Sequence, residues 1–133
     1  MAAPRYLVDT NLCISVLEGV SKNAVDRFGE CELGEVVTSA IVYAEVMIGA
    51  EQRDGADQAL AFFAQVPVLP FDEASGQAYS RLPFKRGSYD RLIAAQALAL
   101  GLTVVTSNVA DFADVPGLKV EDWARPCSQA SDW

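Results

Sequence analysis

The chain has 133 residues, 51% of them hydrophobic and 21% charged, a composition typical of one compact domain with its own core. Its 18 acidic and 10 basic residues give a net charge of −8, which by itself argues against nucleic-acid binding. The chain contains no histidine, the commonest acid–base group of metal-free hydrolysis. No apolar run approaches the roughly 20 residues that span a bilayer, and the start lacks a signal-peptide pattern, so we expect a cytoplasmic location and no membrane partner.

The hydrophobic pattern predicts alternating strands and helices. In chain order we expect a strand at 5–8, helices at 12–18 and 22–29, a strand at 35–38, helices at 40–52 and 55–65, a strand at 66–70, helices at 73–82 and 88–100, a strand at 103–106, a helical turn at 109–112 and a strand near 118–121. Ser39 and Ser88 are expected N-caps, and Gly101 should end the helix before it. This alternation is typical of a parallel α/β sandwich. We expect one domain over 1–126 and a flexible tail over 127–133.

The cysteines Cys13, Cys31 and Cys127 are odd in number and far apart in the sequence. The chain has no Cys-x-x-Cys spacing and no histidine to complete a zinc site. We therefore expect reduced thiols, and any hydrolysis would have to depend on carboxylates and a metal ion.

Acidic residues stand where an α/β domain would turn them toward one edge of its sheet. Asp9 ends the apolar strand 5–8, and Asn108 and Asp111 follow the apolar strand 103–106. The ligand crevices of open parallel sheets lie outside these strand ends. The alternative is local, because Asp and Asn after a strand commonly form turns, and Thr10 and Asn11 can cap the helix at 12–18.

Glu45 and Asp90 lie on helices that are largely apolar. The residues one helical turn from Glu45 are aliphatic or glycine: Ile41, Val42, Ile48 and Gly49. A buried, ionised carboxylate costs on the order of several kcal/mol unless it is paired or metal-bound, although a salt bridge or partial exposure at a groove edge would also explain Glu45. Asp90 opens the helix at 88–100, where an acid also complements the helix dipole.

Several oxygen donors at one sheet edge would suit Mg²⁺ or Mn²⁺ and would repel one another without a cation. A bound cation would also reverse the local charge, so the net charge of −8 does not exclude an RNA substrate. Lys85, Arg86 and Arg91 form the local concentration of positive charge beside Asp90. They are candidates for binding RNA phosphates, and the alternative is a solvated basic loop.

Motifs in order along nearly the whole chain resemble those of VapC-type toxins, which are PIN-domain ribonucleases. They are Leu7-Val-Asp-Thr-Asn11, Ala44-Glu-Val-Met-Ile-Gly-Ala50, Tyr89-Asp-Arg-Leu-Ile-Ala-Ala95, Thr103-Val-Val-Thr-Ser-Asn-Val-Ala-Asp-Phe112, Pro116-Gly-Leu118 and Glu121-Asp-Trp123. The segment between Tyr79 and Asp90 is shorter than in many members of that family. A lone Asp-Thr-Asn would be a weak signal, whereas several motifs in the family's order are specific.

The resemblance implies a fold and a metal site. The fold would be a three-layer α/β/α sandwich with a central, mostly parallel five-stranded sheet. Asp9, Glu45 and Asp90 match the family's first three acids, and the fourth position falls on Asn108 or Asp111. These residues would hold one or two Mg²⁺ or Mn²⁺ ions that activate water for cleavage of a phosphodiester.

The resemblance also implies a biological role. The chain would be the toxin of a type II toxin-antitoxin system, an endoribonuclease that cuts tRNA or a ribosomal RNA loop. Its partners would be a VapB-type antitoxin and a second toxin copy, with DNA contacted only through the antitoxin. To cover an acidic groove, that antitoxin should offer an amphipathic helix and a basic side chain.

Two other functions are considered. The first is a catalytically silent PIN-like interaction module whose acids only receive an arginine of the antitoxin. The second is a Mg²⁺-dependent phosphatase or phosphotransfer domain, which also gathers acids at strand ends. An Asp-x-Asp motif after the first strand and a lysine in the strand at 102–106 would favour the second function, and the sequence has neither.

Overall fold

The computed structural model describes residues 1–83, 85 and 88–125. Within them, parallel strands form one five-stranded sheet in the order β3-β2-β1-β4-β5. The strands are β1 (Tyr6–Val8), β2 (Val36–Ser39), β3 (Val68–Leu69), β4 (Thr103–Thr106) and β5 (Val120–Asp122). The predicted tail at 127–133 lies outside the described residues.

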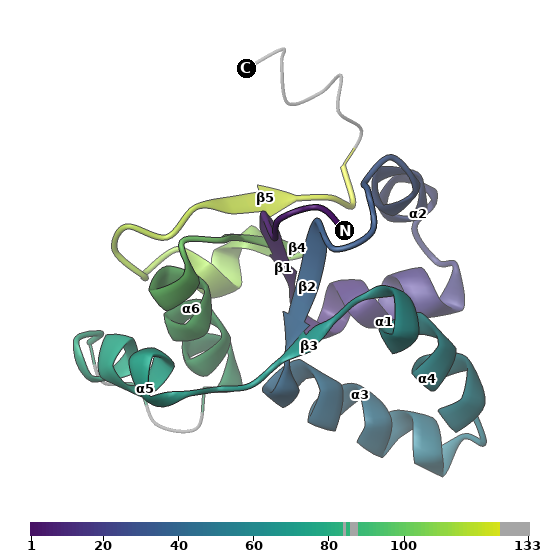
Figure 1. Cartoon of the computed structure of the whole chain (residues 1–133), viewed down its shortest axis with the longest axis horizontal. Coiled ribbons are helices and arrows are strands. Elements are labelled where there is room, and N and C mark those ends of the chain that lie inside the picture. Colours follow the sequence, from purple (N-terminus) through teal and green to yellow (C-terminus); the bar gives the residue numbers. More distant parts are fainter. Residues whose placement is uncertain (84, 86–87, 126–133) are drawn as a thin grey trace.

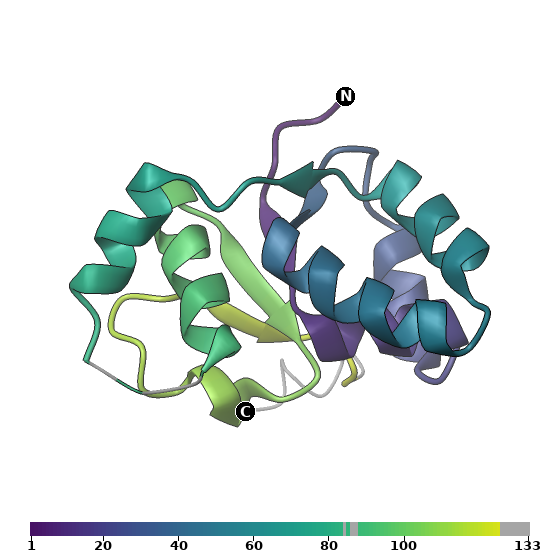
Figure 2. The same ribbon diagram turned by 90° about the horizontal axis from the view of Figure 1, so that it is seen from below.

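Helices cover both faces of the sheet. They are α1 (Thr10–Glu18), α2 (Lys22–Gly29), α3 (Ala40–Gln52), α4 (Ala56–Gln65), α5 (Glu73–Ser80), α6 (Tyr89–Leu100) and the 3₁₀-helix η1 (Val109–Phe112). Figures 1 and 2 show α1, α3 and α4 on one side of the sheet and α5 and α6 on the other. The predicted three-layer α/β/α sandwich is therefore confirmed. Of the helices in the described residues, none combines the length and the apolar character that crossing a bilayer requires.

The central strands are apolar on both faces because helices bury them from both sides. Leu7 and Val8 of β1 and Val104 and Val105 of β4 are each 0% exposed. β1 is the middle strand of the sheet and is hydrogen-bonded to β2 on one side and to β4 on the other. The residue that follows β1 is thus held at the centre of the sheet edge.

Side-chain caps set where α1, α3 and α6 begin. Ser39 and Ser88 accept hydrogen bonds from the backbone N–H groups of Ile41 and Arg91, as the predicted N-caps should. Gly101 ends α6 in the left-handed conformation at φ 70°, as predicted, which glycine adopts without strain. The helix predicted at 12–18 starts earlier, at Thr10, because Asp9 itself is the N-cap.

Proline limits the strand predicted at 66–70. Only Val68 and Leu69 pair with β2, as the edge strand β3. Pro67 and Pro70 bracket this pair, and neither has an N–H group to donate to a sheet. Val66 belongs instead to the end of α4, where its N–H donates to the carbonyl of Phe62.

Two other boundaries differ from the predicted ones by two residues. α5 ends at Ser80 rather than at 82, since the chain turns there with Arg81 as the C-cap. β5 starts at Val120 rather than at 118, after a turn in which Gly117 has φ 78°. Neither difference moves an acidic residue of interest.

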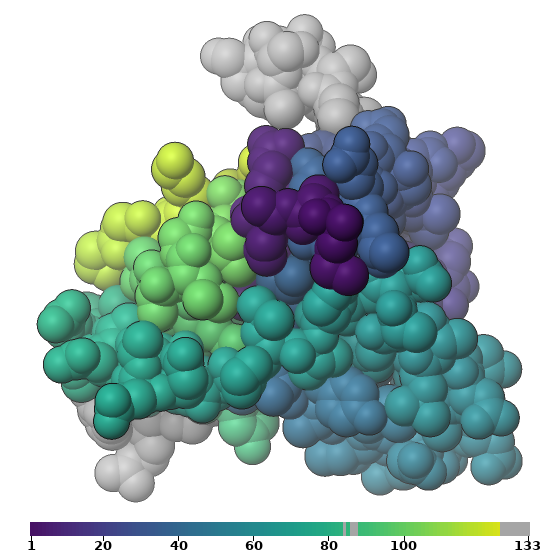
Figure 3. Space-filling view, in the orientation of Figure 1, coloured from purple at the N-terminus to yellow at the C-terminus, as the bar shows by residue number. Residues whose placement is uncertain are grey.

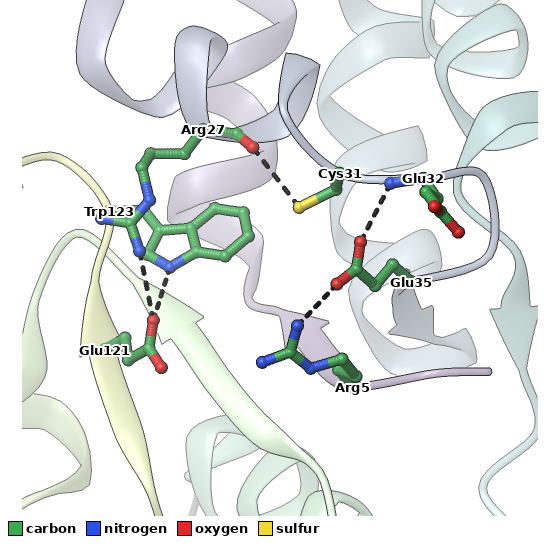
Figure 4. A network of polar contacts seen from close by, with 7 residues as sticks. All are labelled: Arg5, Arg27, Cys31, Glu32, Glu35, Glu121 and Trp123. Atoms are coloured by element: carbon green, nitrogen blue, oxygen red, sulfur yellow. Dashed lines mark hydrogen bonds and ion pairs between the residues drawn. The ribbon is translucent and has the colours of Figure 1, made fainter. Parts of the chain in front are cut away.

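Trp123 anchors the end of β5 to α2 (Figure 4). It is 1% exposed, and its ring makes edge contacts with Tyr6 and Phe28. Its indole N–H donates to Glu121 at 3.0 Å, and Arg27 both pairs with Glu121 and lies 5.0 Å over the indole ring. This cluster fastens the edge strand that follows the predicted fourth acid.

The N-terminal segment lies along the surface beside the loop that leads into β2 (Figure 3, purple against blue). The N–H of Ala2 donates to the carbonyl of Leu33, and the Arg5 guanidinium pairs with Glu35 at 2.8 Å. These contacts fix the entry to β1.

Candidate functional site

The acidic residues meet beside the point where the strand order reverses, next to β1. Asp9 follows β1, Glu45 lies in the second turn of the helix after β2, and Asp111 lies in η1 after β4. A groove of about 420 Å³ opens here. Its lining residues are Asp9, Thr10, Asn11, Glu45, Lys85, Ser88, Tyr89 and Asp90. Three predicted site acids therefore line one groove at the position where parallel sheets bind ligands.

Asp9 is buried and held by two hydrogen bonds. Its side chain is fixed by the Thr106 hydroxyl, which donates to Oδ2 at 2.5 Å, and by the Leu12 N–H, which donates to Oδ1 at 2.9 Å. The residue is 2% exposed. Burial raises the pKa of Asp9 to about 6, and the charges of Asp90 and Asp111 act in the same direction against these two hydrogen bonds.

Glu45 lies at the edge of the groove. It is half-buried, and the Thr10 hydroxyl donates to its Oε1 at 2.6 Å. The apolar surroundings predicted from the sequence are incomplete, because Ile48 on the same helix is 63% exposed. Partial exposure at a groove edge, the alternative considered for Glu45, describes this residue.

Asp90 lies in the first turn of α6, behind the N-cap Ser88. Burial raises the pKa of Asp90, with further increases from the charges of Asp111 and Glu45, while Lys85 opposes the shift. Because Asp111 also raises the pKa of Asp9, the carboxylates of Asp9, Asp90 and Asp111 lie within one another's electrostatic field, and Glu45 adds its charge at Asp90.

Asn108 and Asp111 do not line the groove itself. Asp111 is half-buried in η1 and acts on the groove through its charge. Asn108 is exposed, and its backbone N–H donates to the Thr106 hydroxyl at 3.0 Å. Of the two candidates for the fourth position, Asp111 is the one that adds charge to the site.

The three basic candidates are placed differently. Lys85 is exposed and lines the groove beside Asp90. Arg91 is turned away from it, because its side chain is 6% exposed and paired with Asp114 at 2.5 Å. This placement is at odds with the predicted phosphate contact of Arg91. Arg86 lies outside the described residues.

Two threonine hydroxyls orient carboxylates in a way that was not predicted. Thr10 was considered only as a cap, but its hydroxyl donates to Glu45. Thr106 ends β4 fully buried and donates to Asp9. The hydroxyl at the end of the apolar strand 103–106 is the sequence signal for the role of Thr106. Its partner, Asp9, lies 97 positions away and cannot be identified from the sequence.

The donor set suits a hard divalent cation. Across residues 1–83, 85 and 88–125, no three acidic or cysteine side chains are gathered closely enough to hold a metal ion by themselves. Magnesium is usually bound through only one or two carboxylates together with waters. The carboxylates of Asp9, Glu45 and Asp90 line one groove, and Asp9 and Glu45 each interact electrostatically with Asp90, which fits that kind of coordination.

Comparison with known proteins gives a consistent result. The PIN domain family model matches residues 6–118. The chain is 32% identical over 130 residues to the tRNA(fMet)-specific endonuclease VapC of Salmonella typhimurium. The matched region covers 90% of this chain and 98% of that relative.

Solved structures show the same likeness. DNA-bound VapBC from Salmonella typhimurium has a TM-score of 0.74 at 30% identity, covering 90% of this chain and 98% of that one. VapBC2 from Rickettsia felis, bound to a DNA fragment from its promoter, has a TM-score of 0.77 at 24% identity, covering 89% and 98%. The Rickettsia structure supports the fold alone.

Proposed function

The chain belongs to the PIN domain family, among its VapC-type ribonucleases, and we propose that the groove at Asp9 is the metal-dependent active site of a toxin endoribonuclease. The observation that carries this proposal is the meeting of Asp9, Glu45 and Asp90 in one groove at the reversal of strand order. The relative from Salmonella is named an endonuclease, which supports hydrolysis of RNA over the silent module and the phosphatase.

The three groove acids, with Asp111 beside them, would hold Mg²⁺ or Mn²⁺. When bound, such an ion supplies an activated water and offsets charge on the departing oxygen. The chain itself supplies orientation. Asp9 is fixed by Thr106 and the Leu12 N–H, and each of its oxygens keeps lone-pair capacity for a further partner.

Substrate binding to so acidic a groove depends on positive charge. The cation would offset the carboxylates, and Lys85 at the rim would contact an RNA phosphate. A relative at 32% identity is named tRNA(fMet)-specific, so initiator tRNA is the substrate that we propose first, with a ribosomal RNA loop as the second.

The proposed partner is a VapB-type antitoxin. The Salmonella structure at 30% identity is a VapBC complex on DNA, which supports a toxin-antitoxin hetero-oligomer that contacts DNA through the antitoxin. A toxin homodimer within that assembly belongs to the same proposal. Action on tRNA would place the protein in the cytoplasm.

A cleavage assay tests the proposal. Purified protein and initiator tRNA are incubated with Mg²⁺, Mn²⁺ or EDTA, and the new 5′ ends are mapped by sequencing. We expect cleavage with either metal and none in EDTA or in the Asp9→Asn and Asp90→Asn variants. Asp26→Asn is the control, because Asp26 is an exposed acid paired with Lys22.

Three results would contradict the proposal. Cleavage in EDTA would show that the reaction does not need a metal ion. Undiminished cleavage by Asp9→Asn would show that the groove at Asp9 is not the active site. If phosphate were released from a monoester and RNA were left intact, the phosphatase would be favoured. Metal-binding calorimetry on the wild type separates the nuclease from the silent module, which needs no cation.

A further inference from the structure

An ion pair between a buried arginine and an exposed aspartate joins the two elements that carry Asp90 and Asp111. Arg91, the residue after Asp90, lies in the first turn of α6, and Asp114 lies just beyond η1, three positions after Asp111. Their charged groups meet with Nη2 of Arg91 2.5 Å from Oδ2 of Asp114. The pair therefore connects the third acid of the site to the fourth through the backbone on each side.

Arg91 has little choice of partner. Consecutive residues of a helix point about 100° apart, so an Asp90 that faces the groove turns Arg91 toward the interior. Its side chain is 6% exposed. Among the described residues, Asp114 receives its one side-chain hydrogen bond, and Nε and Nη1 have no partner. The position of the buried Arg91 guanidinium thus depends on Asp114.

The Asp90 and Asp111 carboxylates need such a link more than the other two acids do. Asp9 is held by Thr106 and Glu45 by Thr10. In the described part of the chain, no hydrogen bond reaches the side chain of Asp90 or Asp111. Like charges on two separate elements repel, so their spacing depends on what holds α6 against η1.

We propose that Arg91, acting through Asp114, is a positioning residue that sets the spacing of the Asp90 and Asp111 carboxylates and thereby the affinity for the divalent cation. This inference rests on the proposed function, because it concerns the same metal site. Outer residues that orient ligands typically change metal affinity by about 10- to 100-fold when they are removed.

Titration of Mn²⁺ by calorimetry tests the inference. Asp114→Asn keeps the size of the side chain and removes its charge, and the 54% exposure of Asp114 lets the fold accept the change. We expect about tenfold weaker Mn²⁺ binding, at the lower end of that range. Asp114→Glu restores the carboxylate and should bind Mn²⁺ within about threefold of the wild type.

The control is Asp26→Asn, which breaks the exposed Lys22–Asp26 pair and should leave Mn²⁺ affinity unchanged. If Asp114→Asn melts at a lower temperature but binds Mn²⁺ as the wild type does, the pair is only structural and the inference is overturned. Asp9→Asn tests the proposed function in the same titration. If Mn²⁺ binding survives Asp9→Asn, the cation lies elsewhere, and the proposed function and the inference both fail.

Discussion

The substitution Asp9→Asn tests whether the buried carboxylate destabilises the metal-free fold while it serves to bind the metal ion. Without a cation, the fold holds an almost fully buried carboxylate whose pKa is about 6, against 3.8 for an ordinary aspartate. That difference corresponds to about 3 kcal/mol by which the ionised side chain destabilises the metal-free fold at neutral pH. An uncharged residue of the same shape avoids this cost.

The sign of the pH dependence follows from the raised pKa. Above about pH 6, Asp9 is ionised in both the folded and the unfolded chain, and the fold bears the whole cost. As the pH falls from about 6 toward 3.8, the folded protein takes up the proton first, so its relative stability rises. The asparagine of the Asp9→Asn variant cannot titrate, and this gain should disappear in the variant.

Part of the benefit of Asn is lost again. Asp9 accepts hydrogen bonds on both oxygens, from Thr106 and Leu12, and Asn has only one oxygen. The unmatched bond costs about 1–2 kcal/mol. We therefore expect the variant to be on the order of 1 kcal/mol more stable than the wild type in EDTA near pH 7.

The measurement is urea unfolding in EDTA near pH 7 and near pH 5, repeated with excess Mg²⁺. Mg²⁺ should stabilise the wild type and leave Asp9→Asn unchanged, because only the wild type binds it tightly. A variant that is several kcal/mol less stable than the wild type in EDTA would refute the reasoning, since Asp9 would then be a structural acid. Equal stabilisation of both proteins by Mg²⁺ would place the metal elsewhere.

Four further outcomes are expected. Mn²⁺ affinity should fall as the pH drops below about 6, where Asp9 takes up a proton. Thr106→Val removes a hydrogen bond that lowers the pKa of Asp9, so this fall should begin at higher pH; Thr106→Ser should behave as the wild type, and a pH series of calorimetric titrations compares them. Lys85→Ala should weaken RNA binding in a filter assay without changing Mn²⁺ affinity. Substitution of Lys119, which is also exposed, by Ala should leave both RNA binding and Mn²⁺ affinity unchanged. Trp123→Ala should lower the free energy of unfolding by about 3–5 kcal/mol in urea, and a loss below about 1 kcal/mol would contradict its anchoring role.

Much of the fold follows from local pattern. Alternating apolar segments indicated the order of strands and helices, and Ser39, Ser88 and Gly101 marked helix ends because capping is local chemistry. The edge strand β3 is shorter than predicted, since Pro67 and Pro70 have no N–H group to donate to the sheet. The helix after β1 starts at Thr10 rather than at residue 12, because Asp9, and not Thr10 or Asn11, is the residue that caps it.

The site was predictable as a set of acids and less so as an arrangement. Strand ends indicated Asp9 and the segment around Asp111, since parallel strands share one functional edge. The direction of Arg91 depends on which side of α6 faces the groove, and the link from Thr106 to Asp9 depends on strand order. Both are tertiary facts that a local pattern does not contain.

The central position of β1 has a consequence for the moment at which the protein becomes active. Asp9 is the first acid to be synthesised, but the hydroxyl that orients it arrives 97 residues later, on the strand that completes the pairing of β1. Contacts this distant form late in folding. A chain interrupted during translation just before β4 would carry Asp9, Glu45 and Asp90 without a working groove, so premature termination products should be harmless to the cell that makes them.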